Sequence, residues 1–139
     1  MAEYSKTDRI PFTGLLCGML KEGFPERDFF PERIALRGDG ITVSCEGSGM
    51  ESRYLDGGYR LRVDFCMWTS AKEDSAAARK EAVALLSEIA EYLEDNTLSL
   101  PEGFSSGVFE LKQAPILKKR NTLGEELYAV TVSMRFTRM

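Results

Sequence analysis

The sequence predicts an α+β fold, in which an antiparallel sheet of about four to five strands carries one long amphipathic helix on one face, with a short N-terminal helix beside it. Two segments alternate between apolar and polar residues, as half-buried antiparallel strands do. A third segment repeats apolar residues at helical spacing. The length, 139 residues, is that of one domain, which we place at 1–139.

The first predicted element is a short helix that opens at Pro11, a residue suited to a first helical position. Gly23 fits the left-handed residue just past the helix end, and Pro25 prevents continuation. Its apolar residues recur at spacings of three and four: Leu15, Leu16, Met19 and Leu20.

Strands follow. Two apolar-rich runs flank Gly38-Asp39-Gly40, which predicts a hairpin turn. A turn at Asp56-Gly57-Gly58 then leads into the strand 59–68, whose odd-numbered residues from Tyr59 to Met67 point to one face. The opposite face of this strand carries Cys66 and Trp68 among its charged residues, so the second face of the sheet is only half polar.

The long helix is expected from about Ala71 to Asp95, with Ser70-x-x-Glu73 as a capping box. Its apolar arc includes Val83 and, with the two alternating strands, predicts a helix–sheet core. The core residues expected there are Val63, Phe65, Leu85, Ile89, Val132 and Met134. The opposite, solvated face is acidic and includes Glu81, Glu88, Glu91 and Glu94.

The last unit is a hairpin with arms at about 107–116 and 126–137. Pro115 cannot donate to a ladder, so its strand is expected at an edge or already leaving the sheet. The basic run Lys118-Lys119-Arg120 would then form a projecting tip. Three interpretations stay open for this run: a solvated tip, a contact with protein, or a contact with nucleic acid.

Charge and composition limit the classes of partner that the chain is expected to bind. Residues 107–139 hold 6 of the 18 basic and 3 of the 22 acidic residues, a net +3, which leaves −7 for residues 1–106. A chain of net charge −4 is a poor nonspecific nucleic-acid binder, so we expect nucleic-acid contact to be unlikely. Neither a membrane-spanning run nor a signal peptide is predicted.

The sequence shows few of the residue patterns that are typical of catalytic sites. The chain has no histidine, the commonest general base and zinc ligand. Its three cysteines, Cys17, Cys45 and Cys66, have no metal-binding spacing and are expected to be buried, reduced structural thiols. We therefore expect no enzymatic activity, no cofactor and no metal site.

Three segments resemble the minor capsid or tail terminator proteins of long-tailed bacteriophages and prophage-derived tail-like particles. They are the strand–helix segment 53–94, which opens with Arg53-Tyr54-Leu55-Asp56-Gly57, the closing segment 115–136 and the N-terminal segment 15–26. The resemblance implies a structural virion protein that caps the tail tube, usually as a hexameric ring, and completes it for joining to the head or neck. It implies assembly in the host bacterial cytoplasm, then a place in the virion or tail-like particle.

The implied partners are other copies of the chain, the tail tube protein and a head-completion or neck protein. A ring needs two different patches that meet on neighbouring subunits. The basic tip (Lys118, Lys119 and Arg120) and the acidic helix face are a complementary pair for this contact, and Trp68 is the expected energetic centre. Two alternatives stay open: another head–tail joining or neck component, and an unrelated small α+β binding module.

Overall fold

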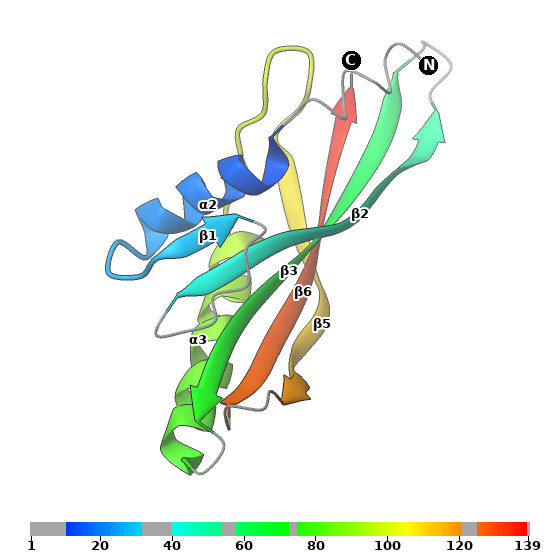
Figure 1. Ribbon diagram of the computed structural model, residues 1–139. Helices are drawn as coiled ribbons and strands as arrows, with labels where there is room; N and C mark the ends of the chain where they lie inside the picture. Colours follow the sequence, from blue (N-terminus) through cyan, green and yellow to red (C-terminus); the bar gives the residue numbers. More distant parts are fainter. Residues whose placement is uncertain (1–10, 32–39, 54–57, 73–74, 121–124, 139) are drawn as a thin grey trace.

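The computed structural model describes residues 11–31, 40–53, 58–72, 75–120 and 125–138. Its elements form an α+β fold, and Figure 1 shows them in order. They are α2 (Phe12–Gly23), β1 (Phe29–Pro31), β2 (Ile41–Arg53), β3 (Tyr59–Lys72), α3 (Ala76–Glu94), β4 (Thr97–Leu98), β5 (Gly107–Arg120) and β6 (Glu125–Arg138).

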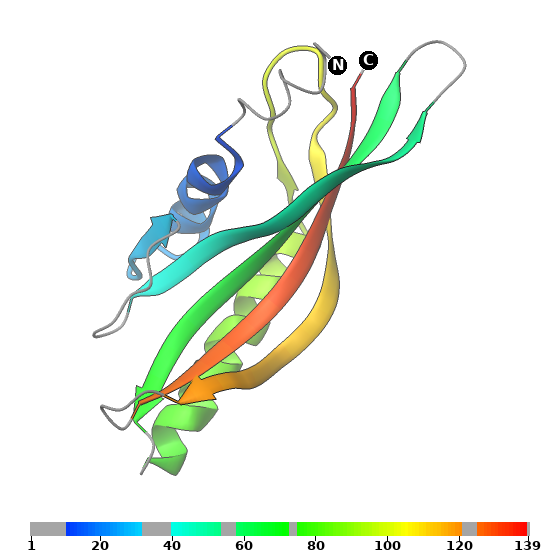
Figure 2. The same cartoon turned by 45° about the vertical axis from the view of Figure 1, so that its right-hand side comes forward.

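The described strands form one six-stranded sheet in the order β1-β2-β3-β6-β5-β4. The sheet is mixed, because β1 pairs with β2 in parallel while every other pair is antiparallel. The prediction of a purely antiparallel sheet of four to five strands was therefore only partly right. The long strands are strongly twisted and cross one another obliquely, and α3 lies behind them in both views (Figures 1 and 2).

The core lies between this sheet and the two helices. β3 and β6 pair along their whole length, which sets Val63 opposite Met134 and Phe65 opposite Val132. These four side chains are fully buried, as is Ile89 of α3, and Leu85 is 9% exposed. The predicted core is confirmed. Val83 was wrongly included in the apolar arc, since it lies at the edge of that arc and is 37% exposed.

The long helix begins later than predicted. Ser70 and Ala71 belong to β3, where they pair with Leu127 and Glu126. The helix starts at Ala76, and its cap is Ser75, whose hydroxyl accepts a hydrogen bond from the Ala78 N–H at 3.1 Å. The predicted capping box at Ser70 was wrong because ladder pairing with β6 satisfies this backbone instead; Glu73 lies outside the described residues.

The first helix ends one residue later than predicted, and for a different reason. Gly23 is the last residue of α2, and among the described glycines only Gly103 has a positive φ. A Cβ on Gly23 would lie 2.5 Å from the Tyr92 ring of α3. Gly23 therefore provides room for the contact between the two helices, and the expected left-handed cap was wrong.

The predicted hairpin around Gly38-Asp39-Gly40 falls mostly outside the described residues, as do Asp56 and Gly57 of the next predicted turn. Gly40 is described and immediately precedes β2. What the structure shows beside the start of β2 is β1, whose three residues pair with Ile41, Thr42 and Val43.

The closing hairpin is longer than predicted. β5 does not leave the sheet at Pro115 but continues to Arg120, where it pairs with Glu126 of β6. At Pro115, β5 is an edge strand, as predicted, because β4 pairs with β5 only at Gly107 and Val108. The run Lys118-Lys119-Arg120 is thus the end of an edge strand, and the projecting tip was wrong.

Candidate interaction surface

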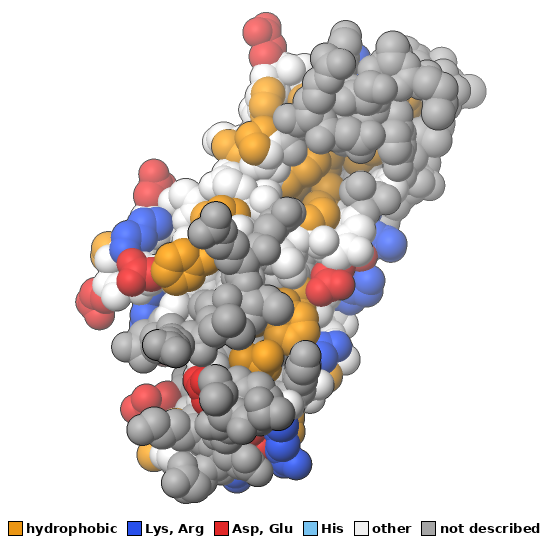
Figure 3. Space-filling model, viewed as in Figure 1, with side chains coloured by type: hydrophobic (Ala, Val, Ile, Leu, Met, Phe, Trp, Pro, Cys, Tyr) orange, Lys and Arg blue, Asp and Glu red, His pale blue; other side chains and the backbone are white. Residues whose placement is uncertain are grey.

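One face of the sheet has no helix over it in the part of the chain that the structure describes. We call it the outer face, since α2 and α3 both pack on the opposite side. Facing pairs on its two central strands are Arg62–Arg135, Asp64–Ser133, Cys66–Thr131 and Trp68–Ala129. Asp64, Cys66, Ala129 and Ser133 are nevertheless buried. In Figure 3, Lys and Arg side chains gather along the right-hand side, where Figure 1 draws β5 and β6, with hydrophobic side chains beside them.

The outer face is hollowed around Trp68. This hollow, of about 530 Å³, is lined by residues of β2, β3, β5 and β6: Glu46, Cys66, Trp68, Lys112, Gln113, Lys118 and Thr131. The indole Nε1 of Trp68 donates to Ser44 Oγ at 3.3 Å, which fixes the ring against β2. The structure therefore brings together two residues selected from the sequence, Trp68 and Lys118.

The three residues of the basic run have different surroundings. Lys118 is exposed and lines the hollow. The side chain of Lys119 lies outside the described part of the structure, although its backbone pairs with Leu127. Arg120 turns to the helix side, where its Nε lies 2.9 Å from Glu126 Oε2. Only Lys118 is shown on the outer face.

Glu126 is the centre of a charged cluster that sequence reasoning missed. Its carboxylate is 1% exposed and lies between Arg120 and Arg79 of α3, whose Nε is 2.7 Å from Oε1. Tyr128 Oη also donates to Oε1 at 3.2 Å. The hydrogen bond from Arg120 lowers the pKa of Glu126 most, and the charge of Arg79 lowers it further against the opposing effect of burial. Glu126 thus links Arg120, at the end of β5, to Arg79 of α3.

The acidic set lies on the helix layer. Glu81, Glu88, Glu91 and Glu94 are all exposed, as predicted. Because the sheet separates them from the outer face, the structure does not bring them together with Trp68 and Lys118 within one chain. The two surfaces can meet only between chains.

A second charged cluster lies on the outer face itself. Asp64 Oδ2 lies 2.8 Å from Lys112 Nζ, and its Oδ1 accepts from Ser133 Oγ at 2.6 Å. Arg62 Nε is 3.4 Å from the same Oδ1. Burial acts to raise the pKa of Asp64, but the hydrogen bonds from Lys112 and Ser133 and the nearby cations outweigh it and hold this pKa below its ordinary value. Alternation in the sequence placed Arg62 and Asp64 on this face but gave no sign of Lys112.

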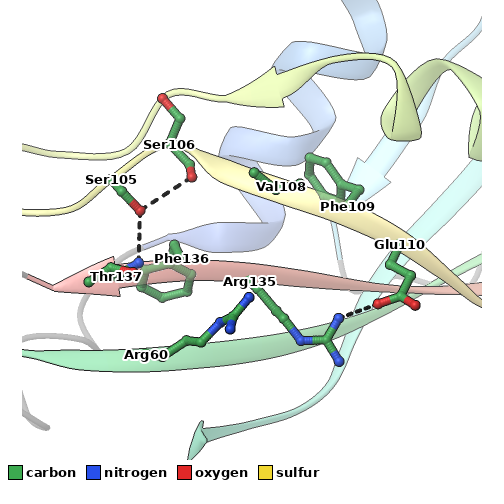
Figure 4. A pocket seen from close by; sticks show the side chains of 9 residues that line it. All are labelled: Arg60, Ser105, Ser106, Val108, Phe109, Glu110, Arg135, Phe136 and Thr137. Carbon is green, nitrogen blue, oxygen red and sulfur yellow. Dashed lines mark hydrogen bonds and ion pairs between the residues drawn. The ribbon is translucent and has the colours of Figure 1, made fainter. Parts of the chain in front are cut away.

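Figure 4 shows a second hollow, of about 470 Å³, bordered by β5 and β6. Arg60 and Arg135 lie along one side of it, and Arg135 forms an ion pair with Glu110. On the other side, Ser105 Oγ accepts from the Thr137 N–H at 2.8 Å. Val108, 56% exposed, forms part of the wall. This hollow was not anticipated from the sequence.

Among the described residues, no group of three or more Cys, Asp or Glu side chains is placed to hold a metal ion. The two described helices include none that is both long and apolar enough to span a membrane.

Comparison with known proteins does not assign the chain to a family. No protein-family model matches the chain, and a search of curated proteins found no match. Among solved structures, a chain of the virion of a native gene transfer agent particle is similar, with 16% sequence identity and a TM-score of 0.48. The similarity covers 80% of this chain and 77% of that chain. At this identity and TM-score it establishes neither a family nor a function.

Proposed function

We propose that this chain is a non-enzymatic structural subunit of a phage or phage-tail-like particle, which assembles as a ring and caps the tail tube. The resemblance of segments 15–26, 53–94 and 115–136 to tail terminator proteins motivates the proposal. Its partners would be further copies of itself, the tail tube protein and a head-completion or neck protein.

The observation that carries the proposal is the separation of two unlike surfaces onto opposite layers of one chain. The outer face presents Trp68 and Lys118 in a hollow, and α3 presents its acidic face on the other side. A ring requires this kind of heterologous contact, in which a patch on one subunit meets a different patch on the next. Exposed charge pairs contribute little affinity, so they would set register and association rate, while Trp68 would add apolar contact.

The proposed function is tested by measuring the length of tail tubes. The tail tube protein that the proposal names as a partner is polymerised with and without the purified chain, and tube lengths are measured by electron microscopy. A terminator stops growth and appears as a ring at the tube end. Tubes of unchanged length, with the chain bound only to a head or neck protein, would favour the alternative of a neck component.

The contact between copies is tested by charge reversal. Lys118→Glu with Lys119→Glu should weaken ring formation, more at low salt, where the Debye length is longest. Arg120 is left unchanged because its reversal would place a second carboxylate against buried Glu126 and disturb the fold. Adding Glu88→Lys and Glu91→Lys to the same chain should partly restore assembly, as coupled partners require.

Two controls accompany this experiment. Glu102→Lys changes the charge of an exposed loop residue by the same amount as Glu88→Lys and should restore nothing. Lys80→Glu makes the helix surface more acidic and should not weaken the ring. If the Lys118 and Lys119 variant assembles and caps normally but loses DNA binding that the parent chain shows, the basic residues contact nucleic acid and the proposed contact is wrong.

A further inference from the structure

The strand β5 has a long open edge. β6 pairs with one side of it, while on the other side β4 pairs only with Gly107 and Val108. From Phe109 to Arg120, no other strand in the described residues lies on that side. Every residue from Glu110 to Lys118 except Pro115 is exposed. The backbone donors and acceptors on this side are therefore accessible to another chain.

This edge is also apolar. Six large hydrophobic side chains are exposed among the described residues, and four of them lie on β5: Val108, Leu111, Ile116 and Leu117. The register sets Leu111 opposite Val132 and Leu117 opposite Tyr128, on the helix side. Ile116 faces Ala129 on the outer face, as Val108 faces Arg135. Apolar side chains on both faces are typical of a strand inside a sheet, covered from both sides.

Two features restrict what can pair with this edge. Pro115 has no N–H, and the register of β5 shifts at three places along its length. Such interruptions protect an edge from indiscriminate pairing, so the usable edge consists of a short run on each side of Pro115.

We infer that the β5 edge binds, by strand addition, an extended segment of another protein of the particle. The segment carries apolar side chains on both faces, to match Leu111 and Leu117 on the helix side and Ile116 on the outer face. This rests on the proposed function, in which copies of the chain meet through the outer face and α3; that contact leaves the β5 edge to a different protein. Backbone pairing supplies affinity, and the apolar side chains select the segment.

The test uses the tail tube protein and the neck protein that the proposed function names as partners, each mixed with the full chain. Amide hydrogen exchange is measured by mass spectrometry before and after complex formation. Strand addition predicts new protection within 109–120, on one or both sides of Pro115. Ile116→Glu with Leu117→Glu should weaken that complex by about tenfold or more, because a buried apolar contact is lost and a charge is buried.

The matched control for Ile116→Glu alone is Val83→Glu, which adds one charge at an equally exposed apolar position on α3. It should leave the complex unchanged, and circular dichroism should show that all variants fold. Protection of β5 by neither protein would overturn the inference, as would protection that appears in the chain alone as its concentration rises, which would mean pairing with a second copy. A chain that limits tube length without β5 protection disproves only the inference, whereas failure to limit tube length counts against the function itself.

Discussion

Replacing Ile89 with alanine tests the packing of α3 on the sheet. Ile89 is 0% exposed and lies in the cluster that joins α3 to β3 and β6. The change removes three carbon groups, each contributing about 0.8 kcal/mol on burial. A residual cavity adds to this loss, and the better helix propensity of alanine offsets about 0.4 kcal/mol. The free energy of unfolding should fall by about 3 kcal/mol, within the range of about 2–5 kcal/mol for such changes.

Urea unfolding, followed by circular dichroism and by the fluorescence of Trp68, the single tryptophan, measures this loss. Coincident transitions from the two probes establish two-state unfolding. Val83→Ala on the same helix is the control, because Val83 is 37% exposed and its truncation should change stability by no more than about 0.5 kcal/mol. A loss below about 1 kcal/mol for Ile89→Ala, or equal losses for the two variants, would refute the assigned helix face.

Three further predictions follow from the cap, the carboxylates and the thiols. Ser75→Ala should lower the free energy of unfolding, measured in urea, by about 1 kcal/mol. Ser70→Ala removes no helix cap and should lower it by less. The pKa values of Asp64 and Glu126 lie below their ordinary values of 3.8 and 4.5. The stability that these carboxylates contribute is therefore complete above the ordinary values and is lost as pH falls through the folded pKa values. The urea concentration at the unfolding midpoint should decrease below about pH 4.5, and Asp64→Asn should make it depend less on pH. Cys17 and Cys66 are buried as expected, but Cys45 is exposed, so the prediction of a buried thiol was wrong there. Burial raises the pKa of Cys17 and of Cys66 to about 11, so iodoacetamide at pH 8 should modify Cys45 first, as peptide mapping would show. Cys66→Ser should still support assembly.

The parts of the fold that were predictable are those in which local pattern and burial agree. β3 and β6 have one helix-covered face, so apolar residues recur at every second position from Tyr59 to Met67 and from Tyr128 to Phe136. α3 has one buried stripe, so its period is helical. In both cases the position of a residue in the repeat decides whether water reaches it.

The errors lie where a long-range contact decides the local structure. Ser70-x-x-Glu73 has the residues of a helix cap, but pairing of Ser70 and Ala71 with β6 keeps them in the sheet. Glycine is the usual residue of a left-handed cap, yet the role of Gly23 is set by Tyr92, 69 positions later in the sequence. β1 has three residues, too few for any periodicity, and its parallel pairing with β2 has no local signal.

The candidate surface was predictable only in part. Alternation alone placed Cys66 and Trp68 on the uncovered face, and helical spacing exposed the acidic residues of α3. Lys112 could not be found in this way, because its contact with Asp64 depends on β5 lying next to β6 and β6 next to β3. The register shift between Leu111 and Gln113 adds a further step that no pattern in the sequence shows.

The basic run illustrates why three adjacent like charges need not form one patch. The register of β5 shifts between Leu117 and Lys119, so neighbouring residues no longer follow simple alternation. Lys118 lines the hollow beside Trp68, whereas Arg120 reaches Glu126 on the helix side and is held there with Arg79. Reversing all three charges at once would mix a change of surface with damage to a buried ion pair, since a buried carboxylate that loses one cationic partner is strongly destabilising. A loss of assembly in such a triple variant would therefore say nothing about the interface, and the separate treatment of Lys118 and Arg120 is what makes the proposed contact testable.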